Sequence, residues 1–292
     1  MGLKNNELAV VRAEHMPSGD GCQTLFTQGV ILARLDFSPC IEYDFFGTER
    51  TPKFHGETEK MSTAPSDSAT PKRTLEELDN LIEKYHLLKH PFYRAWTEGT
   101  LSKESLRLYA AQYYRHVRAF PENLKQLASR AKGPLEQLVE ENLAEELDAS
   151  ASHPVLWRHF AESLGVNDAM LDEARPLPGI TALLDAFDEV VSRGTLAQAA
   201  ASFYAYEAQV PEIATQKIAG LRQYYRITDP RSLAYFAVHE EADVRHRAAW
   251  REWLATQDAD AASGVLDAAE RTLKALWGAL DAVYPEGCAA IN

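Results

Sequence analysis

Apolar residues recur at helical spacing through most of the chain, from Thr74 to the C-terminal region. In this part proline and glycine stand mostly at the ends of the periodic segments, where helices begin and end. No segment shows the alternation of a β-strand, and no internal repeat is apparent. The pattern predicts an all-α fold with helices over 74–88, 102–131, 134–150, 153–165, 179–193, 195–225, 230–256 and 259–283.

Individual residues define several of these helix ends. In "TLSKESL", Ser102 is a typical N-cap, and an acidic residue follows in the first turn. In "TDPRSL", Asp229 is the expected N-cap and Pro230 takes the first helical position. Pro121 lies inside the helix predicted over 102–131, and because proline removes a backbone donor we expect a break or kink there.

The first part of the chain has a different character. Residues 1–72 contain clusters such as "MPSGDG" and "STAPSDSATPK", with no sustained helical period. We therefore expect residues 1–72 to form a flexible or weakly structured N-terminal extension and residues 73–292 to form one helical domain. Met61 offers an alternative start for the protein.

Composition narrows the choice of partners. The net charge is −13 and the basic residues are scattered, which argues against nucleic acid as a partner. The chain has no run of about 18 apolar residues and no basic-then-apolar leader, so we expect a cytoplasmic protein without a membrane partner. Cys22, Cys40 and Cys288 lie near the chain ends, which excludes a disulfide framework and a cysteine-based zinc site in the middle.

One carboxylate stands out for its surroundings. In "LAQAAASFYAYEAQVP", Glu207 is the only charged residue, and the segment is apolar on nearly all sides. This helix is therefore predicted to be central and Glu207 to be buried. A buried carboxylate must be neutralised, paired or bound to a metal. The simpler alternative is a carboxyl group that is hydrogen-bonded to a tyrosine or an arginine.

Two further groups contain potential metal ligands. In "AVHEEADVRHR", His239, Asp243 and His246 fall within an arc of roughly 60° on one helix face. In "EELDASASHPVLW", Glu146 and His153 are seven residues apart, two turns along one face if a single helix contains both. The alternative for the first group is an acidic, solvated helix face, and the alternative for the second is a surface acid plus a histidine near a helix end.

Taken together, the three groups supply three carboxylates and three imidazoles, enough to hold two adjacent metal ions. Hard oxygen ligands mixed with histidine suit iron or manganese. Helical bundles hold dinuclear sites with inward-facing carboxylates from several helices. The spacing differs from the Glu-x-x-His pair of ferritin-like proteins, which indicates another scaffold.

Four motifs then make the chain resemble a known family: "HPFYRAW", "YYRHVRAFP", "YEAQVPEIATQKI" and "YFAVHEEADVRHR". With Glu146 and the gap to His153, they resemble the haem-oxygenase-like dimetal oxidases, and most closely the family of the Chlamydia protein associating with death domains. The resemblance extends from about Leu75 to Cys288. It implies a seven-helix haem-oxygenase-like bundle with a diiron or iron–manganese centre. The implied ligands are Glu146, His153, Glu207, His239, Asp243 and His246.

The resemblance also implies an activity, which is synthesis of p-aminobenzoate for folate biosynthesis. In that family the protein's own tyrosine is thought to supply the ring and an internal lysine the amine, and the matching residues here are Tyr93 and Lys217. Dioxygen would be the co-substrate, and an external reductant would be needed. We also single out Tyr206, beside Glu207, as a residue of an oxidation pathway.

Several alternatives remain open at this stage. One is an oxidase that acts on an external small molecule, as the enzyme that closes pyrroloquinoline quinone does, with Glu207 as an acid–base group. A thiamin-salvage hydrolase of the same scaffold would need a core cysteine, which is missing. An interaction protein and a haem protein using His86, His90 or His116 have less support. The sequence leaves open whether the chain forms a homodimer.

Overall fold

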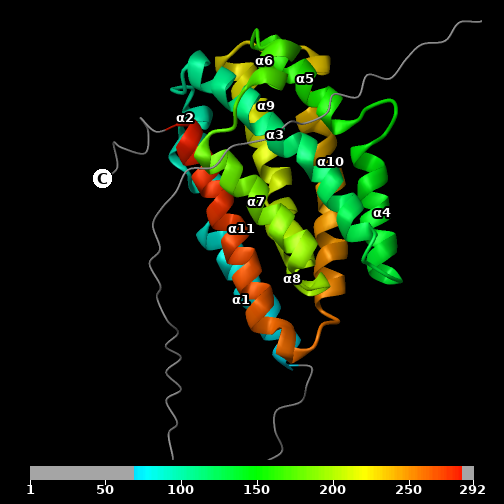
Figure 1. The fold of residues 1–292 in the computed structure, drawn as a ribbon. Coiled ribbons are helices and arrows are strands. Elements are labelled where there is room, and N and C mark those ends of the chain that lie inside the picture. The colour runs from blue at the N-terminus through cyan, green and yellow to red at the C-terminus, as the bar shows by residue number, and fades with distance from the viewer. Residues whose placement is uncertain (1–68, 285–292) are drawn as a thin grey trace, which may run out of the picture. The chain divides into compact units, whose positions relative to one another are not determined.

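The computed structural model describes residues 69–284, and within this range the chain is all-α, as predicted. The described residues form eleven α-helices and two short 3₁₀-helices, η1 (Leu87–Lys89) and η2 (Ala259–Ala261), and contain no strand (Figure 1). The α-helices are α1 (Ala69–Lys84), α2 (Pro91–Glu98), α3 (Lys103–Ala128), α4 (Pro134–Glu146), α5 (His153–Ser163), α6 (Asp168–Glu173), α7 (Pro178–Arg193), α8 (Leu196–Glu207), α9 (Val210–Tyr224), α10 (Pro230–Leu254) and α11 (Ala262–Val283).

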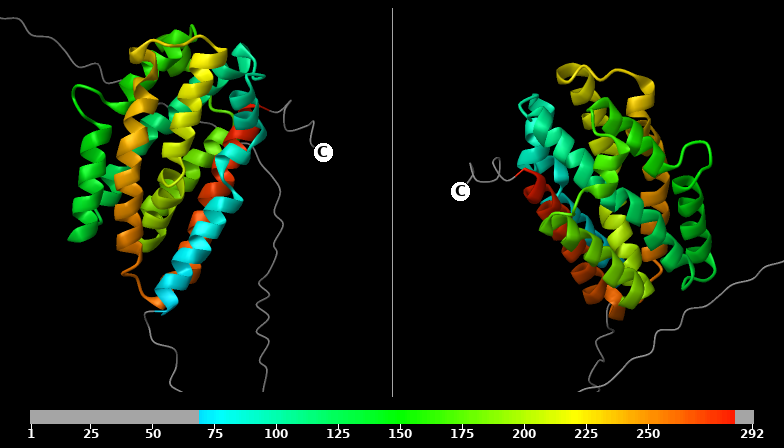
Figure 2. Two further views of the ribbon diagram at one scale, coloured as in Figure 1. Left: turned by 180° about the vertical axis from the view of Figure 1, so that it is seen from behind. Right: turned by 45° about the horizontal axis from the view of Figure 1, so that its top comes forward.

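Helix α10 is the element around which the other site-bearing helices gather. It packs against α4, α5, α8 and α9, and the view from behind shows it between α4 and α9 (Figure 2, left). Helix α8 also packs against α7 and α11, and all but two of its residues are buried. Alanines make up much of α8, so neighbouring helices can approach its backbone closely. The carboxylate at its end therefore lies deep in the bundle.

Most predicted helix boundaries agree with the structure to within a few residues. Ser102 caps α3 by accepting a hydrogen bond from the backbone of Ser105, and Asp229 caps α10. Helix α1 begins at Ala69, inside the segment predicted as an extension, and residues 1–68 lie outside the described range. Cys22, Cys40 and Cys288 lie outside it as well.

Two helix predictions differ from the structure, the break expected at Pro121 and the single helix over 195–225. Helix α3 continues through Pro121 without a break, because Phe120 and Leu124 are buried on either side and hold the helix in the core. The helix predicted over 195–225 is instead two helices, since α8 ends at Glu207 and α9 begins at Val210, with a proline in its first turn.

Helix α2 was not predicted, because it has only eight residues and is too short to show a helical period. Its ends are well defined. His90 caps the start by accepting a hydrogen bond from the backbone of Phe92, and Gly99 ends the helix with a φ of 72°. The short helix α6 was missed for the same reason.

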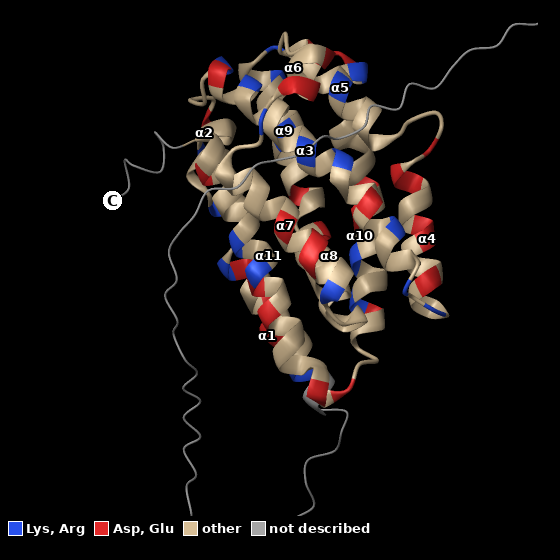
Figure 3. Ribbon diagram, in the orientation of Figure 1, with Lys and Arg blue, Asp and Glu red and all other residues tan. Residues whose placement is uncertain are grey.

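Acidic and basic residues are interspersed along the helices, as the colouring of the ribbon in Figure 3 shows. Among the described residues, no helix is both long and apolar enough to cross a membrane.

Candidate dimetal site

Helix α10 carries a buried stripe of polar and aromatic side chains. His239, Asp243 and His246 are 5%, 4% and 8% exposed, so the solvated-face alternative does not hold. The stripe continues in both directions, to Tyr235 one turn before His239 and to Trp250 one turn after His246. These two aromatic residues were not selected from the sequence, although the same spacing rule would have found them.

The predicted ligands lie in two groups of three buried residues. The Glu146 cluster consists of Glu146, His153 and His239, and the Glu207 cluster consists of Glu207, Asp243 and His246. In each cluster the potential ligand atoms lie within 4.8 Å of one another. Since His239 and Asp243 are one turn apart on α10, the two clusters are neighbours along the same helix face.

Glu146 and His153 lie on different helices, as the helices predicted over 134–150 and 153–165 imply, so the condition for one shared helix face is not met. Helix α4 ends at Glu146, and His153 is the first residue of α5. The loop between them contains a turn in which Asp148 accepts hydrogen bonds from the backbone and hydroxyl of Ser150. The two side chains still meet, because His153 Nδ1 lies 2.8 Å from Glu146 Oε1.

In the Glu146 cluster both imidazoles are held close together. Their ring centroids are 4.5 Å apart. His239 Nδ1 lies 2.6 Å from the carbonyl oxygen of Tyr235, which favours a proton on Nδ1 and leaves Nε2 as a potential ligand. His153 Nδ1 is buried and has no hydrogen bond of good geometry, in spite of its short distance to Glu146. Such an arrangement fits two groups that bind a common cation rather than each other.

The Glu207 cluster is built differently. Asp243 Oδ1 lies 3.3 Å from His246 Nδ1, and Glu207 Oε2 lies 3.9 Å from the same nitrogen. The other ring nitrogen of His246 faces Glu145, whose Oε2 is 3.4 Å away. Asp243 Oδ2 is buried without a hydrogen-bond partner. An unpartnered buried carboxylate oxygen is rare in native proteins, and metal coordination accounts for it.

The electrostatics of the two clusters also fit cations. Burial raises the pKa of Glu146 to about 8, and burial together with the charge of Asp243 raises the pKa of Glu207. Burial lowers the pKa of His246, but its hydrogen bond to Asp243 and the charge of Glu207 outweigh this and raise it to about 9. Without a metal, protons therefore neutralise Glu146 and Glu207 in much of the protein at neutral pH. Divalent ions would replace these protons.

A small enclosed pocket, here called the inner cavity, adjoins the Glu146 cluster. His239 and Tyr235 line one part of it, and Tyr93, Tyr206 and Lys217 are also in its wall. About 20 Å³ is open to the centre of a water-sized sphere, whereas one water needs about 10–15 Å³ by this measure. The cavity therefore has room for a diatomic molecule or for one or two waters.

Lys217 is buried in an aromatic environment rather than on the surface. Its Nζ donates a hydrogen bond of 2.7 Å to the hydroxyl of Tyr109, which lies 3.3 Å from the hydroxyl of Tyr93. Burial lowers the pKa of Lys217 to about 7. The Nζ atom lies within 6.0 Å of the ring centroids of Tyr93, Trp96, Tyr109, Tyr113, Trp157 and Phe236.

Close packing of α9 on α2 places Lys217 beside Tyr93. A Cβ atom at Gly220 would lie only 2.6 Å from the Trp96 ring, so glycine is required there for this approach. The Trp96 indole donates a hydrogen bond of 3.3 Å to the carbonyl oxygen of Lys217. Tyr93 is 3% exposed, and Lys217 Nζ is 5.2 Å from its ring centroid.

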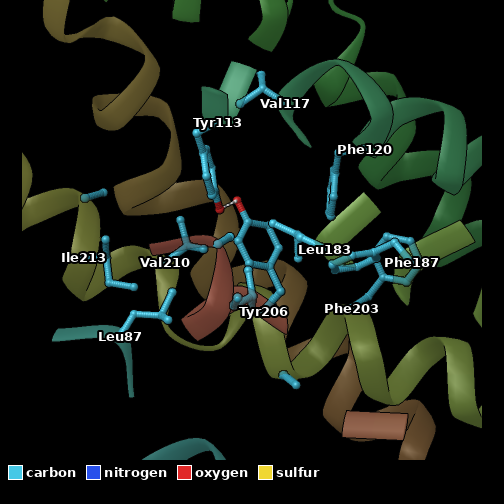
Figure 4. Packing of buried hydrophobic residues seen from close by; sticks show 14 of the residues in the cluster. Leu87, Tyr113, Val117, Phe120, Leu183, Phe187, Phe203, Tyr206, Val210 and Ile213 are labelled. Atoms are coloured by element: carbon cyan, nitrogen blue, oxygen red, sulfur yellow. Dashed lines mark hydrogen bonds between the residues drawn. The ribbon is translucent and has the colours of Figure 1, made fainter. Parts of the chain in front are cut away.

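Tyr206 connects this environment to the end of α8. The hydroxyl of Tyr113 donates a hydrogen bond of 3.4 Å to that of Tyr206, as Figure 4 shows. On one side of Tyr206 lie Phe120, Phe187 and Phe203 (Figure 4). Tyr113 in turn stacks on Tyr109, with 5.1 Å between ring centroids. A continuous set of aromatic rings thus leads from Tyr206 to the hydrogen-bonding partner of Lys217.

The histidines considered for haem binding have other roles. His86 and His90 cap η1 and α2 through their Nδ1 atoms, and His90 Nε2 lies 3.1 Å from Asp281. His116 is buried among aromatic rings that include Phe120 and Phe187, and burial lowers its pKa to about 3. The geometry therefore gives no support to a haem site.

Comparisons with known proteins agree with this geometry. A family model described as iron-containing redox enzyme matches residues 107–277. A 4-aminobenzoate synthase of Chlamydia trachomatis is 38% identical over 217 residues, which cover 73% of this chain and 93% of that protein. A 4-aminobenzoate synthase of Nitrosomonas europaea is 36% identical over 228 residues, covering 73% and 92%. A pyrroloquinoline-quinone synthase of Pseudomonas aeruginosa is 27% identical over 233 residues, covering 76% and 90%.

Solved structures share the fold at low sequence identity. A TenA homologue from Pseudomonas syringae has a TM-score of 0.65 at 16% identity, covering 79% of this chain and 99% of its own. A domain with a heme oxygenase-like fold from Shewanella denitrificans has a TM-score of 0.63 at 18% identity, covering 76% and 94%. These likenesses confirm the predicted haem-oxygenase-like fold.

Proposed function

This chain belongs to the family of iron-containing redox enzymes, and from that membership we propose that it activates dioxygen at a dimetal centre to make 4-aminobenzoate. Support comes from relatives that carry the name 4-aminobenzoate synthase and match over more than nine-tenths of their own length. The weaker similarity to pyrroloquinoline-quinone synthases keeps an external small-molecule substrate as the second candidate.

We assign the two clusters as the binding sites of two metal ions, either two irons or one iron and one manganese. The ligands would be Glu146, His153 and His239 for one ion and Glu207, Asp243 and His246 for the other. When bound in reduced form, such ions would supply electrons to dioxygen, and an external reductant would be the source of these electrons. The surrounding helices exclude water from this chemistry, because all six side chains are less than 10% exposed.

The size of the inner cavity is the observation that favours a substrate from the protein itself. The cavity can hold dioxygen but has no room for an aromatic molecule, and an aromatic ring, that of Tyr93, already stands in its wall. Lys217 lines the same cavity and can supply the amine. We therefore propose that Tyr93 is the source of the ring and Lys217 the source of the nitrogen.

The hydrogen bonds around Lys217 suit this role. Because burial holds the pKa of Lys217 near 7, a large fraction of its side chain is the neutral amine at neutral pH, and a neutral amine has the free electron pair needed to form a bond to carbon. Tyr109 accepts the hydrogen bond from the amine and lies beside the Tyr93 hydroxyl, so it aligns the two reacting groups.

Tyr206 is proposed as a residue through which oxidation reaches this pair. It lines the inner cavity, and its hydroxyl accepts the hydrogen bond from Tyr113, which stacks on Tyr109. Burial raises the pKa of Tyr206 well above its usual value, so the phenol keeps its proton until it is oxidised. The Tyr113 hydroxyl next to it is one of the polar groups in the cavity wall.

The test is a reaction without any added aromatic substrate. The metal-loaded, reduced protein is exposed to dioxygen, and released 4-aminobenzoate is quantified by mass spectrometry. We expect at most about one equivalent per chain, because a consumed residue cannot turn over. Ring-labelled tyrosine incorporated into the protein should appear in the product. Tyr93→Phe, which keeps the ring packing and removes the phenol, should stop release while both metal ions stay bound.

Tyr225→Phe is the matched control, since the Tyr225 hydroxyl donates to the carbonyl of Leu101 and is not part of the inner cavity wall. This variant should release product as the wild type does. Many turnovers per chain, or full release from Tyr93→Phe, would instead favour an external substrate at the same site.

A further inference from the structure

The carboxylate of Glu207 is held by two neutral donors from two different helices. The amide of Asn142, on α4, donates a hydrogen bond of 2.8 Å to Oε1. The indole of Trp250, on α10, donates one of 2.7 Å to Oε2. Glu207 itself is the last residue of α8 and is 1% exposed. Both oxygens of this one carboxylate are therefore fixed from opposite elements of the bundle.

The two donors are themselves buried. Trp250 has no exposed surface and stacks on Phe203, with ring centroids 5.3 Å apart and planes 13° apart. Asn142 is 1% exposed, and its amide oxygen has no hydrogen-bond partner. An unsatisfied buried oxygen costs stability. The amide nitrogen of this same residue donates to Glu207, so a placement that costs stability indicates a functional reason.

We propose that Trp250 and Asn142 are positioning residues. They hold Glu207 in the orientation in which it binds the metal ion of the Glu207 cluster. This inference rests on the dimetal centre of the proposed function. Each carboxylate oxygen has a further lone pair, so the hydrogen bonds leave room for a metal. Neutral donors also keep the negative charge of Glu207 available to the ion.

The neighbourhood of Glu207 explains why such positioning is needed. His246 Nδ1 lies only 3.9 Å from Glu207 Oε2. A carboxylate released from Trp250 can turn toward this ring nitrogen and pair with it instead of with a metal ion. That pair would occupy two ligands of the Glu207 cluster at once, so the second ion would bind more weakly.

Metal titration of the full-length chain tests the proposal directly. The protein is stripped with a chelator and titrated with Mn²⁺, and bound metal is measured by calorimetry and elemental analysis. Trp250→Phe removes the N–H donor and keeps an aromatic ring against Phe203. We expect one of the two ions to bind roughly 10–100-fold more weakly and the other to bind within about twofold of wild type, the range typical of lost outer-shell hydrogen bonds.

Two further variants make the result specific. Asn142→Leu removes the other donor, which lies on a different helix, and should weaken binding of the same ion. This variant also tests the proposal if Trp250→Phe folds poorly. Trp253→Phe is the matched control, because Trp253 lies three residues further along α10 in the outer groove between α4 and α10, and it should bind both ions as wild type does. In a Glu207→Gln background, Trp250→Phe should have no further effect on metal binding.

Wild-type affinity for both ions in Trp250→Phe and Asn142→Leu overturns the proposal, and so does an equal loss of both ions. A wild-type chain that binds fewer than two ions overturns it too. A wild-type chain that binds two ions but releases no 4-aminobenzoate contradicts the proposed function and leaves this inference intact.

Discussion

The Glu146 cluster and the Glu207 cluster share one helix but differ in donor type and in surroundings. The first has two imidazoles and one carboxylate, and through His239 it borders the inner cavity. The second has two carboxylates and one imidazole, and Asn142 and Trp250 donate hydrogen bonds to its Glu207. The difference indicates that the first cluster faces the reacting groups, whereas the second is oriented by hydrogen bonds from residues outside the cluster.

Both clusters owe their shape to the helices that α10 meets. Helices α4 and α5 bring Glu146 and His153 to one end of the stripe on α10, and the end of α8 brings Glu207 to the other. Asp243 stands between them in the stripe. The charge of Asp243 adds to the effect of burial in raising the pKa of Glu207 and that of Glu146. It also acts to raise the pKa of His153, against the larger lowering effect of burial. Together with His246, which also acts on the pKa of Glu146 and of His153, it couples the two clusters electrostatically.

Replacing Asp243 should therefore have the largest effect of any single change. We expect Asp243→Ala to weaken binding of both ions and to reduce 4-aminobenzoate release by more than about 100-fold. Loss of an outer-shell partner alone lowers metal affinity or activity by up to about 100-fold, and Asp243 is a proposed ligand. The helical circular dichroism should persist, because the side chain is one of several crowded carboxylates that repel each other without metal. Glu241→Ala, an exposed neighbour on α10, is the control. Two ions bound with wild-type affinity in Asp243→Ala would contradict the coupling.

Changing the inner cavity should separate chemistry from metal binding. Lys217→Met removes the amine and keeps most of the apolar stem, so we expect no 4-aminobenzoate while two ions remain bound. Elemental analysis and the product assay on the same sample measure both quantities. Loss of metal in this variant would show that the cavity and the clusters are not independent.

The same variant should change stability in a pH-dependent manner. Burial lowers the pKa of Lys217 to about 7, whereas an unfolded lysine has a pKa of about 10.4. Between these values the unfolded chain binds more protons, so the stability of the wild type rises with pH by at most about 1.4 kcal/mol per pH unit. Lys217→Met should thus be more stable than wild type at pH 7, and the gain should shrink toward pH 10. Denaturant unfolding at several pH values measures this, and a gain that grows with pH would contradict it.

A smaller effect concerns the rate of product release in the wild type. With a pKa of about 7, the neutral fraction of the Lys217 amine rises about tenfold between pH 6 and pH 8. Burial raises the pKa of Tyr93, Tyr109 and Tyr113 above this range, so these groups do not titrate in it. We expect the single-turnover rate to rise about tenfold over this interval in samples with equal metal content. A flat or falling profile would exclude the neutral amine as the reacting form.

The parts of the molecule that could be predicted from sequence are those governed by one helix. The spacing of His239, Asp243 and His246 fixes a common face whatever surrounds the helix, and the apolar setting of Glu207 required its burial. The all-α fold and most helix ends followed from periodicity and capping residues in the same way.

The parts that could not be predicted depend on contacts between helices. The sequence separated the helices over 134–150 and 153–165, but the small residues after Glu146 allow a helix as readily as a turn, so the end of α4 at Glu146 had no clear signal. Asn142 acquires its role only when α4 meets the end of α8. The break before α9 did have a signal, because Pro211 disfavours a helix through the preceding residues.

The smallest expected effect is a difference in metal preference between the two clusters. Two histidines and one carboxylate form the ligand set typical of non-haem iron, whereas a carboxylate-rich set suits manganese. Iron binds more tightly than manganese to most such sites, so ligand type gives only a preference and not exclusion. We expect protein loaded with both metals to show more iron at the Glu146 cluster and more manganese at the Glu207 cluster. Anomalous scattering at the two absorption edges measures the occupancies.

His153→Asp, which makes the Glu146 cluster richer in carboxylate, should shift its metal preference toward manganese. Equal occupancies at both clusters in the wild type would show that their different donors do not govern metal choice.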